Sequence, residues 1–138
     1  MPAQTLVEIR LVSNIKAMRT KPFVARLRKD GSLEFLRATI PWFDRGVFIG
    51  GKYLLAEGDL VISRCDFSTH KHETIVYYLD KVENGKLKTL AKITVADGTP
   101  HFEPRELENV YVDVIVSGKA KNRNKYVQTL IEYAKKFM

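Results

Sequence analysis

Alternating apolar and polar residues predict short β-strands over most of the chain. Between Thr5 and Val12, three apolar residues alternate with Glu8 and Arg10, which is the two-residue period of a half-buried strand. A helix that carries apolar residues from Val7 to Met18 fits the same stretch, so both interpretations stay open there.

Similar runs continue towards the C-terminus. Further strands are predicted at residues 23–29, 33–40, 60–65, 74–79, 87–95 and 110–116, and the last of these, Val-Tyr-Val-Asp-Val-Ile-Val, is the clearest. Asp30-Gly31 and Asn84-Gly85 are hairpin turn signals. Pro41 lacks an N–H group and is expected to end the strand before it.

Two stretches lack the alternating pattern of the strands. Residues 41–58 predict a connection with a helical turn or a short strand, and residues 97–104 predict a loop. A helix is expected from Asn122 to Phe137, because apolar residues recur there at spacings of four, three and four. Packing of that helix on a sheet is favoured, with a partner or dimer helix as the alternative.

Five short strands, a Gly-rich connection after the third and a basic exterior indicate a mainly β fold. We expect a five-stranded OB-like barrel with additional C-terminal strands and a C-terminal amphipathic helix. The length of 138 residues fits a single domain over residues 1–138, in which 5–80 form the OB-like core and 86–138 form a strand and helix extension.

Length and composition also limit where the protein works. No stretch reaches 18 apolar residues, and the first five residues lack the profile of a signal peptide. Cys65 is the single cysteine, so an internal disulfide is excluded. We therefore expect a cytoplasmic protein.

The net charge of +7 is concentrated at the two ends of the chain. The balance is +6 over residues 1–29, zero over 30–52, −4 over 53–118 and +5 over 119–138. Segregated basic charge is typical of proteins that bind polyanions, of which nucleic acid is the commonest. We expect the two ends to form one continuous basic patch with the outer face of strand 23–29.

Catalytic motifs are absent from the sequence, so no enzyme activity and no cofactor is expected. Cys65, His70 and His72 form the only metal-like grouping, and they can supply at most three ligands. Cys65 is therefore interpreted as a small buried residue.

Basic and aromatic side chains are the candidates for binding. Arg26 and Arg28 share the outer face of one strand, where they can contact phosphates or, as the alternative, pair with Glu34 or Asp66. Trp42 and Phe67 are predicted in loops, where an aromatic ring can stack on a base unless it is buried. The expected nucleic-acid-binding residues are Lys16, Arg19, Lys21, Arg26, Arg28, Arg37, Trp42, Arg45, Lys52, Arg64, Phe67 and Lys71. Phe23, Phe35 and Tyr77 are assigned to core or strand packing.

Four segments resemble, in order, the S1-like OB domain of translation initiation factor 1A. They are Arg28–Leu33, Thr39–Pro41, Glu57–Ile62 and Glu73–Tyr78. The order is kept over residues 5–80. Trp42 stands where the family has Gly, the Lys-rich loop of the family holds only Arg45 and Lys52 here, and residues 86–138 match loosely. The resemblance implies an OB fold and RNA binding, with the ribosome as a partner.

These observations predict a non-enzymatic protein that binds single-stranded nucleic acid, with RNA favoured over DNA. One alternative is a single-stranded DNA-binding protein of an archaeon or virus. The other is a structural or assembly protein of a virion or ribonucleoprotein.

Overall fold

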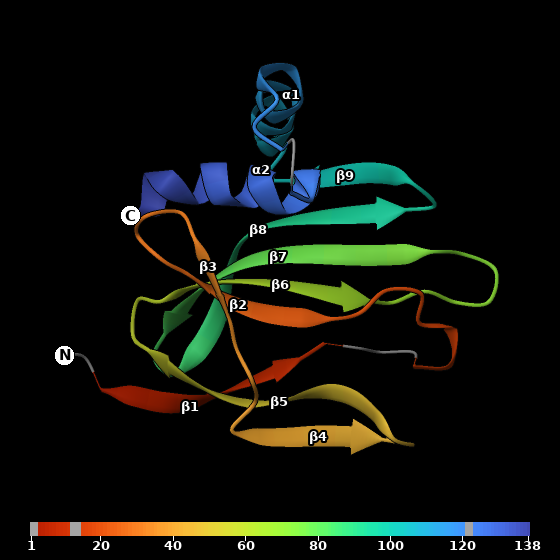
Figure 1. Cartoon of the computed structure of the whole chain (residues 1–138), viewed down its shortest axis with the longest axis vertical. Coiled ribbons are helices and arrows are strands. Elements are labelled where there is room, and N and C mark those ends of the chain that lie inside the picture. Colours follow the sequence, from red (N-terminus) through yellow and green to blue (C-terminus); the bar gives the residue numbers. More distant parts are fainter. Residues whose placement is uncertain (1–2, 12–14, 121–122) are drawn as a thin grey trace.

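The computed structural model describes residues 3–11, 15–120 and 123–138, and its strands form two antiparallel sheets (Figure 1). The small sheet has the order β1 (Gln4–Arg10), β5 (Val47–Ala56), β4 (Ile40–Asp44). The large sheet has the order β3 (Leu33–Phe35), β2 (Phe23–Leu27), β6 (Leu60–Asp66), β7 (Thr74–Glu83), β8 (Lys86–Ala96), β9 (Thr99–Glu103). The helices are α1 (Leu107–Ser117) and α2 (Lys125–Ala134), and two short 3-10 turns, η1 (Ile15–Ala17) and η2 (Lys135–Phe137), complete the elements.

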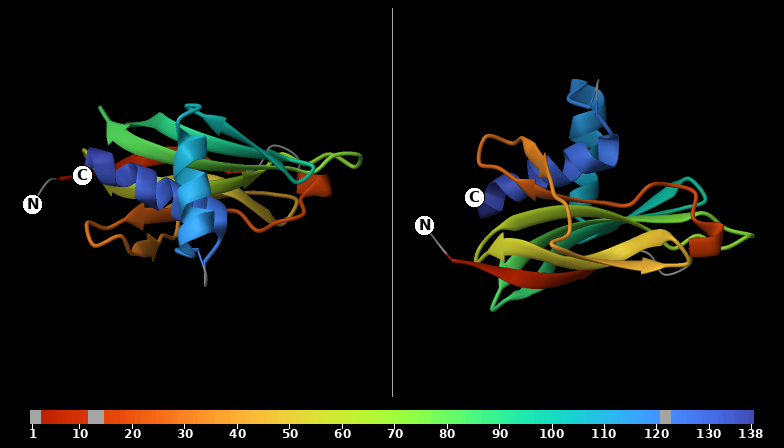
Figure 2. Two further views of the ribbon diagram at one scale, coloured as in Figure 1. Left: turned by 90° about the horizontal axis from the view of Figure 1, so that it is seen from above. Right: turned by 60° about the horizontal axis from the view of Figure 1, so that its bottom comes forward.

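The large sheet is the middle of three layers. The small sheet covers one of its faces, and α2 lies across the other with α1 crossing above it (Figures 1 and 2). Side chains alternate along β6 and contribute to two hydrophobic cores. Ile62 points to the core under the helices, while Val61 and Cys65 point to the core between the sheets. Leu79 and Leu130 are fully buried in the helix-side core, and Tyr53 and Leu55 are buried in the core between the sheets.

The mainly β character and the C-terminal helix are confirmed. Asp30-Gly31 and Asn84-Gly85 both form the turns between antiparallel strands, with φ values of 86° at Gly31 and 53° at Asn84. The described strands form two sheets and no closed barrel, so the OB-like barrel is not confirmed. Neither described helix is long and apolar enough to cross a membrane.

The C-terminal helix begins later than predicted. Asn124 caps α2 by accepting hydrogen bonds from the N–H groups of Tyr126 and Val127, at 2.8 and 3.2 Å. The helix then continues to Phe137 as η2. Asn122, and Val12 at the end of the first predicted strand, lie outside the described residues.

The prediction of a strand at 110–116 is wrong, because these residues lie in α1. Leu107, Val110, Tyr111 and Val114 recur at i, i+3, i+4 and i+7, so they share one helical face, and Leu107 and Val114 are buried. That face packs against α2 and β9. Tertiary packing therefore outweighs the β-propensity of the valines.

The prediction for residues 33–58 is also wrong in its boundaries. Strand β3 ends at Phe35, and Pro41 lies inside β4. Strand β4 is at the edge of its sheet, where a missing N–H is tolerated. Residues 47–56 form one long strand, in which Gly50 and Gly51 let β1 and β4 approach closely; a Cβ on Gly50 would lie 2.3 Å from the Ile9 carbonyl oxygen. The predicted loop at 97–104 contains β9, which pairs with β8.

Candidate nucleic-acid interface

A groove opens where the chain crosses from the large sheet to the small one. The Leu36 N–H still donates to the Val24 carbonyl of β2 at 2.9 Å, and the Thr39 N–H already donates to the Lys52 carbonyl of β5 at 2.8 Å. Arg37 and Ala38 therefore bridge the sheets along this edge, and the space beside them remains open.

We call this space the aromatic groove, and it has a volume of about 440 Å³. Its size is that of a small-ligand site. The lining residues come from the segment leading into β2, from β2, β3, β4 and β5, and from the crossing segment: Lys21, Pro22, Phe23, Val24, Phe35, Leu36, Arg37, Ala38, Pro41, Phe48 and Tyr53.

Phe35 is the exposed aromatic ring of the groove. Phe35 was assigned to core or strand packing; it is 66% exposed, so it does not lie in the core. It meets Phe23 edge to face, with 5.5 Å between the ring centroids. Because Phe23 packs against the helix-side core, it holds the Phe35 ring in place. An ordered, exposed ring of this kind can stack on a nucleobase.

Cationic groups surround this aromatic pair. The Arg64 guanidinium lies 5.1 Å from the Phe23 ring centroid, and its Nε and Nη2 donate to the Lys21 carbonyl at 3.0 and 2.7 Å. Lys21 and Arg37 have exposed side chains that line the groove. Neither forms an ion pair within the part of the chain that the structure describes. Their charges are thus open to an anionic ligand.

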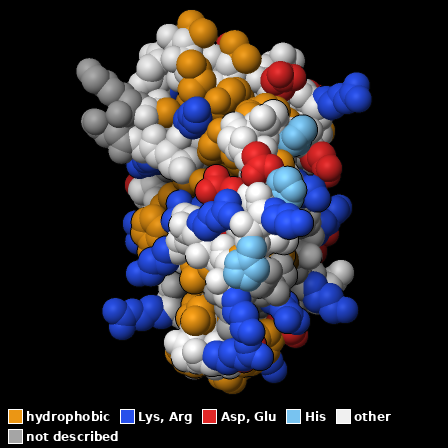
Figure 3. Space-filling model, turned by 90° about the vertical axis from the view of Figure 1, so that its right-hand side faces the viewer, with side chains coloured by type: hydrophobic (Ala, Val, Ile, Leu, Met, Phe, Trp, Pro, Cys, Tyr) orange, Lys and Arg blue, Asp and Glu red, His pale blue; other side chains and the backbone are white. Residues whose placement is uncertain are grey.

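More basic residues lie at the adjoining end of the molecule, on the right in Figure 1 and facing the viewer in Figure 3. This basic end comprises η1, the segment leading into β2, the β4–β5 turn and the β6–β7 loop. Lysine, arginine and histidine side chains gather on it (Figure 3). The predicted binding residues found there are Lys16, Arg19, Lys21, Arg45 and Lys71, all exposed.

The buried carboxylate of Asp66 organises the basic end. Its Oδ2 accepts hydrogen bonds from the N–H groups of Arg19 and Thr20 at 2.6 and 2.8 Å, and its Oδ1 accepts from the Ser68 N–H at 2.8 Å. Burial alone would raise the pKa of Asp66, but these hydrogen bonds lower it below its ordinary value. Arg19 in turn donates to the Thr69 carbonyl at 3.0 Å. Two cationic segments are thereby fixed side by side.

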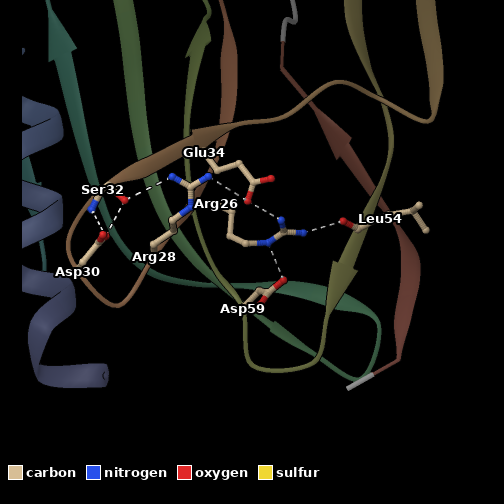
Figure 4. A network of polar contacts seen from close by, with 7 residues as sticks. All are labelled: Arg26, Arg28, Asp30, Ser32, Glu34, Leu54 and Asp59. Atoms are coloured by element: carbon tan, nitrogen blue, oxygen red, sulfur yellow. Dashed lines mark hydrogen bonds and ion pairs between the residues drawn. The ribbon is translucent and has the colours of Figure 1, made fainter. Parts of the chain in front are cut away.

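Arg26 does not point freely outwards, because it forms the pairing with Glu34 that was the alternative to a phosphate contact. Its guanidinium bonds to Glu34 at 2.8 Å, to Asp59 at 3.1 Å and to the Leu54 carbonyl at 3.0 Å (Figure 4). Burial alone would lower the pKa of Arg26, but the bonds to the two carboxylates raise it. Arg26 therefore clamps β2 to β5 of the other sheet. Arg28 is more exposed and lies at the β2–β3 turn, away from the basic end.

Three other predicted binding residues lie away from the groove. Trp42 was expected in a loop but lies half-buried in β4, opposite Gly50. Phe67 is partly buried against the core between the sheets, so packing accounts for it. Lys52 is half-buried in β5, where it lies opposite Glu8 of β1 in the strand register.

The two basic ends of the chain do not form one continuous patch. Lys16, Arg19 and Lys21 lie at the basic end, whereas α2 runs to the opposite end of the molecule (Figure 1). There the β2–β3 turn, which follows Arg28, lies beside Lys119, Arg123 and Lys135. Glu132 pairs with Lys119 at 3.3 Å and with Lys135 at 2.6 Å, and Glu106 pairs with Lys136 at 3.3 Å. Acidic partners therefore offset much of the C-terminal charge.

Cys65 is buried, as expected, with an exposed fraction of 2%. Burial, together with the charge of Asp80, raises the pKa of its thiol to about 12. Among the described residues, no group of three or more His, Cys, Asp or Glu side chains is placed to hold a metal ion.

Sequence reasoning missed the Phe23–Phe35 pair as a binding element. The alternation in Leu33–Glu34–Phe35 places Phe35 on the same face as Leu33, and this pattern does not distinguish a packed ring from an exposed one. The available signal was the shortness of that run before the polar Arg37 and Thr39. Comparisons with models of protein families, with curated proteins and with solved structures find no match.

Proposed function

We propose that this protein binds single-stranded nucleic acid, RNA in preference to DNA, in the aromatic groove and across the basic end. The observation that carries the proposal is the exposed Phe35 ring, braced by Phe23 and bordered by Lys21, Arg37 and Arg64. The protein acts as a binding module and not as an enzyme, and it works in the cytoplasm.

Stacking supplies the preference for unpaired bases. A base on an aromatic ring contributes roughly 1–3 kcal/mol, and only a single strand presents its bases freely. The groove holds one such ring at its opening, with cations close enough to hold the flanking phosphates.

The charges supply the rest of the affinity. Lys16, Arg19, Lys21, Arg45 and Lys71 extend the cationic surface beyond the groove, so a strand of several nucleotides can follow it. Affinity should fall with salt at a slope of roughly −0.7 per neutralised phosphate. The resemblance to the S1-like domain of initiation factor 1A favours RNA, and a ribosomal or other ribonucleoprotein RNA is the proposed partner.

Fluorescence anisotropy with labelled oligouridylate, the matching DNA and a duplex tests the proposal. Phe35→Ala should weaken single-strand binding by about 1–3 kcal/mol, because the stacking surface is removed. Phe137→Ala is the matched control, since Phe137 is also exposed and edge to face with an aromatic ring, Tyr133, but lies at the opposite end. Absence of binding at low salt, or equal losses in both variants, would contradict the proposal. Tighter binding of DNA than RNA would instead favour the DNA-binding alternative.

A structural or assembly role is the second candidate, and the outer side of α1 favours it. Val112, Ile115 and Val116 are 49%, 48% and 81% exposed. Sedimentation of the free protein across a concentration series tests this candidate, since self-association that Val116→Lys abolishes would support it. A concentration-independent monomer would count against assembly through this face.

A further inference from the structure

A second hollow lies at the other edge of the two-sheet sandwich. The aromatic groove opens beside β4, whereas this hollow lies where β1 faces β8, and its volume is about 190 Å³. We call it the Asp80 pocket. It is lined by Glu8, Ile9, Arg10, Ser63, Cys65, Tyr78, Asp80, Leu87 and Thr89.

Asp80 is the unusual group of this pocket. Its side chain points between the sheets, it is only 4% exposed, and the pairing of β7 with β8 shifts register at Leu79 and Asp80. Among the described residues its Oδ1 has no hydrogen-bond partner. Burial raises the pKa of Asp80 to about 6, although a hydrogen bond with the Thr89 side chain acts in the opposite direction. A buried carboxylate oxygen without a donor is costly unless a ligand supplies one.

The side chains around Asp80 limit which functional groups a ligand of this pocket can carry. Ser63 and Tyr78, which carry hydroxyl groups, are among the lining residues, and oxygen acceptors suit a donor with several N–H groups. The Cys65 thiol is already used, since its Sγ donates to the Arg10 carbonyl at 3.7 Å. Its raised pKa keeps the thiol protonated, so Cys65 adds no negative charge beside Asp80.

Apolar walls and a balanced rim complete the pocket. Ile9 is 4% exposed and Leu87 is partly buried in the core between the sheets, so an alkyl chain would find apolar contacts. Glu8 and Arg10 have exposed side chains of opposite charge at the rim, so the rim itself carries little net charge. The volume of about 190 Å³ is large enough for a short alkyl chain with one polar head, and the hollow is open to solvent on one side.

We propose that the Asp80 pocket binds a small primary ammonium ion, with its N–H groups on the Asp80 carboxylate and neighbouring hydroxyls and its short alkyl chain against Ile9 and Leu87. The site lies at the edge opposite the aromatic groove and does not depend on the proposed binding of nucleic acid. A compact cation offers three donors to a carboxylate that lacks one, and a neutral or anionic ligand of the same shape does not.

Nuclear magnetic resonance titration with butylammonium tests the proposal, with 1-butanol and butyrate as neutral and anionic ligands of similar shape. Backbone amides around Ser63, Cys65 and Asp80 should shift with butylammonium. Its affinity should exceed that of butanol about tenfold or more, the usual value of one hydrogen bond to a charged group.

Asp80→Asn keeps the side-chain shape and should weaken butylammonium binding by a similar factor, about tenfold or more. Asp44→Asn removes an exposed carboxylate elsewhere and should change nothing. Equal binding of butanol and butylammonium by the native protein, or no localised shifts at tens of millimolar ligand, would overturn the proposal whether or not the Asp80 variant folds. Undiminished binding by a folded Asp80→Asn variant would overturn it as well.

Discussion

The two edges of the sandwich are built differently, although the same two sheets meet at both. At the β3–β4 edge the chain itself crosses between the sheets, and the space beside residues 36–39 stays open to aromatic and cationic side chains. At the β1–β8 edge the described residues include no such crossing, the strands approach directly, and a smaller, shallow hollow is lined by a buried carboxylate. The comparison indicates that the path of the segment between β3 and β4, more than the composition of the strands, determines which edge exposes charged side chains to a ligand.

The largest expected effect concerns the groove edge. Lys21→Glu combined with Arg37→Glu should weaken RNA binding by about 3 kcal/mol or more, because two unpaired cations become anions beside the same strand. The slope of affinity against salt concentration should become shallower, since fewer phosphates are neutralised. Anisotropy titrations over a salt series measure both quantities.

Lys135→Glu combined with Lys136→Glu makes the same change of charge at the far end of the molecule. Because both lysines already pair with Glu132 or Glu106, RNA affinity should change little. If this control weakened binding as much as the groove variant, net charge alone would explain affinity and the contrast between the edges would be lost.

The next effect concerns the β1–β8 edge and depends on pH. Burial raises the pKa of Asp80 from an unfolded value near 4 to about 6, so the folded state holds its proton more tightly than the unfolded state. Stability from this group is therefore present below pH 4 and is lost as the pH rises to about 6. Relative to Asp80→Asn, the native chain should lose roughly 2–3 kcal/mol of unfolding free energy between pH 4 and pH 8.

Urea denaturation of the native chain and the Asp80→Asn variant at several pH values measures this difference in unfolding free energy. The contributions of the other titrating groups are the same in both proteins and cancel. A constant difference across the range would mean that Asp80 reaches solvent or a donor in the folded protein. A buried carboxylate without a donor would then no longer distinguish the β1–β8 edge from the groove.

The smallest effect concerns the clamp between the sheets. Arg26→Ala should cost about 1–2 kcal/mol of unfolding free energy, because Glu34 and Asp59 lose a partner that is only partly exposed. RNA affinity should stay close to that of the native protein, since Arg26 is engaged in the clamp. A marked loss of affinity in a stably folded variant would return Arg26 to the binding surface.

Local signals predicted much of this fold. Asp30-Gly31 and Asn84-Gly85 favour the positive φ angles that their turns require, so both hairpins could be predicted from the sequence alone. The structure of residues 110–116 could not be predicted in this way, because Val110 and Val114 fit both the alternating spacing of a strand and the spacing of a helix. Only the packing of α1 on α2 decides between them.

The candidate site was harder to predict than the hairpins. Lys21, Arg37 and Arg64 were found from charge, but their gathering around Phe23 and Phe35 depends on how distant strands pair. The same pairing places Asp59 beside Arg26, a contact that alternation within one strand cannot reveal.

The pairing of β1 with β5 has a consequence for the order of events in folding. Gln4 lies opposite Ala56, so the first strand of the chain has no partner until some fifty residues later have been made. The neighbours β6, β7, β8 and β9 are joined in sequence order and can form from local contacts alone. During synthesis we therefore expect β1 to leave the ribosome before β5 and to stay unpaired until β5 has followed it. Such a wait exposes an apolar strand to other chains. The charges of Glu8 and Arg10, set among its apolar residues, then act against aggregation before they have any role in the finished molecule.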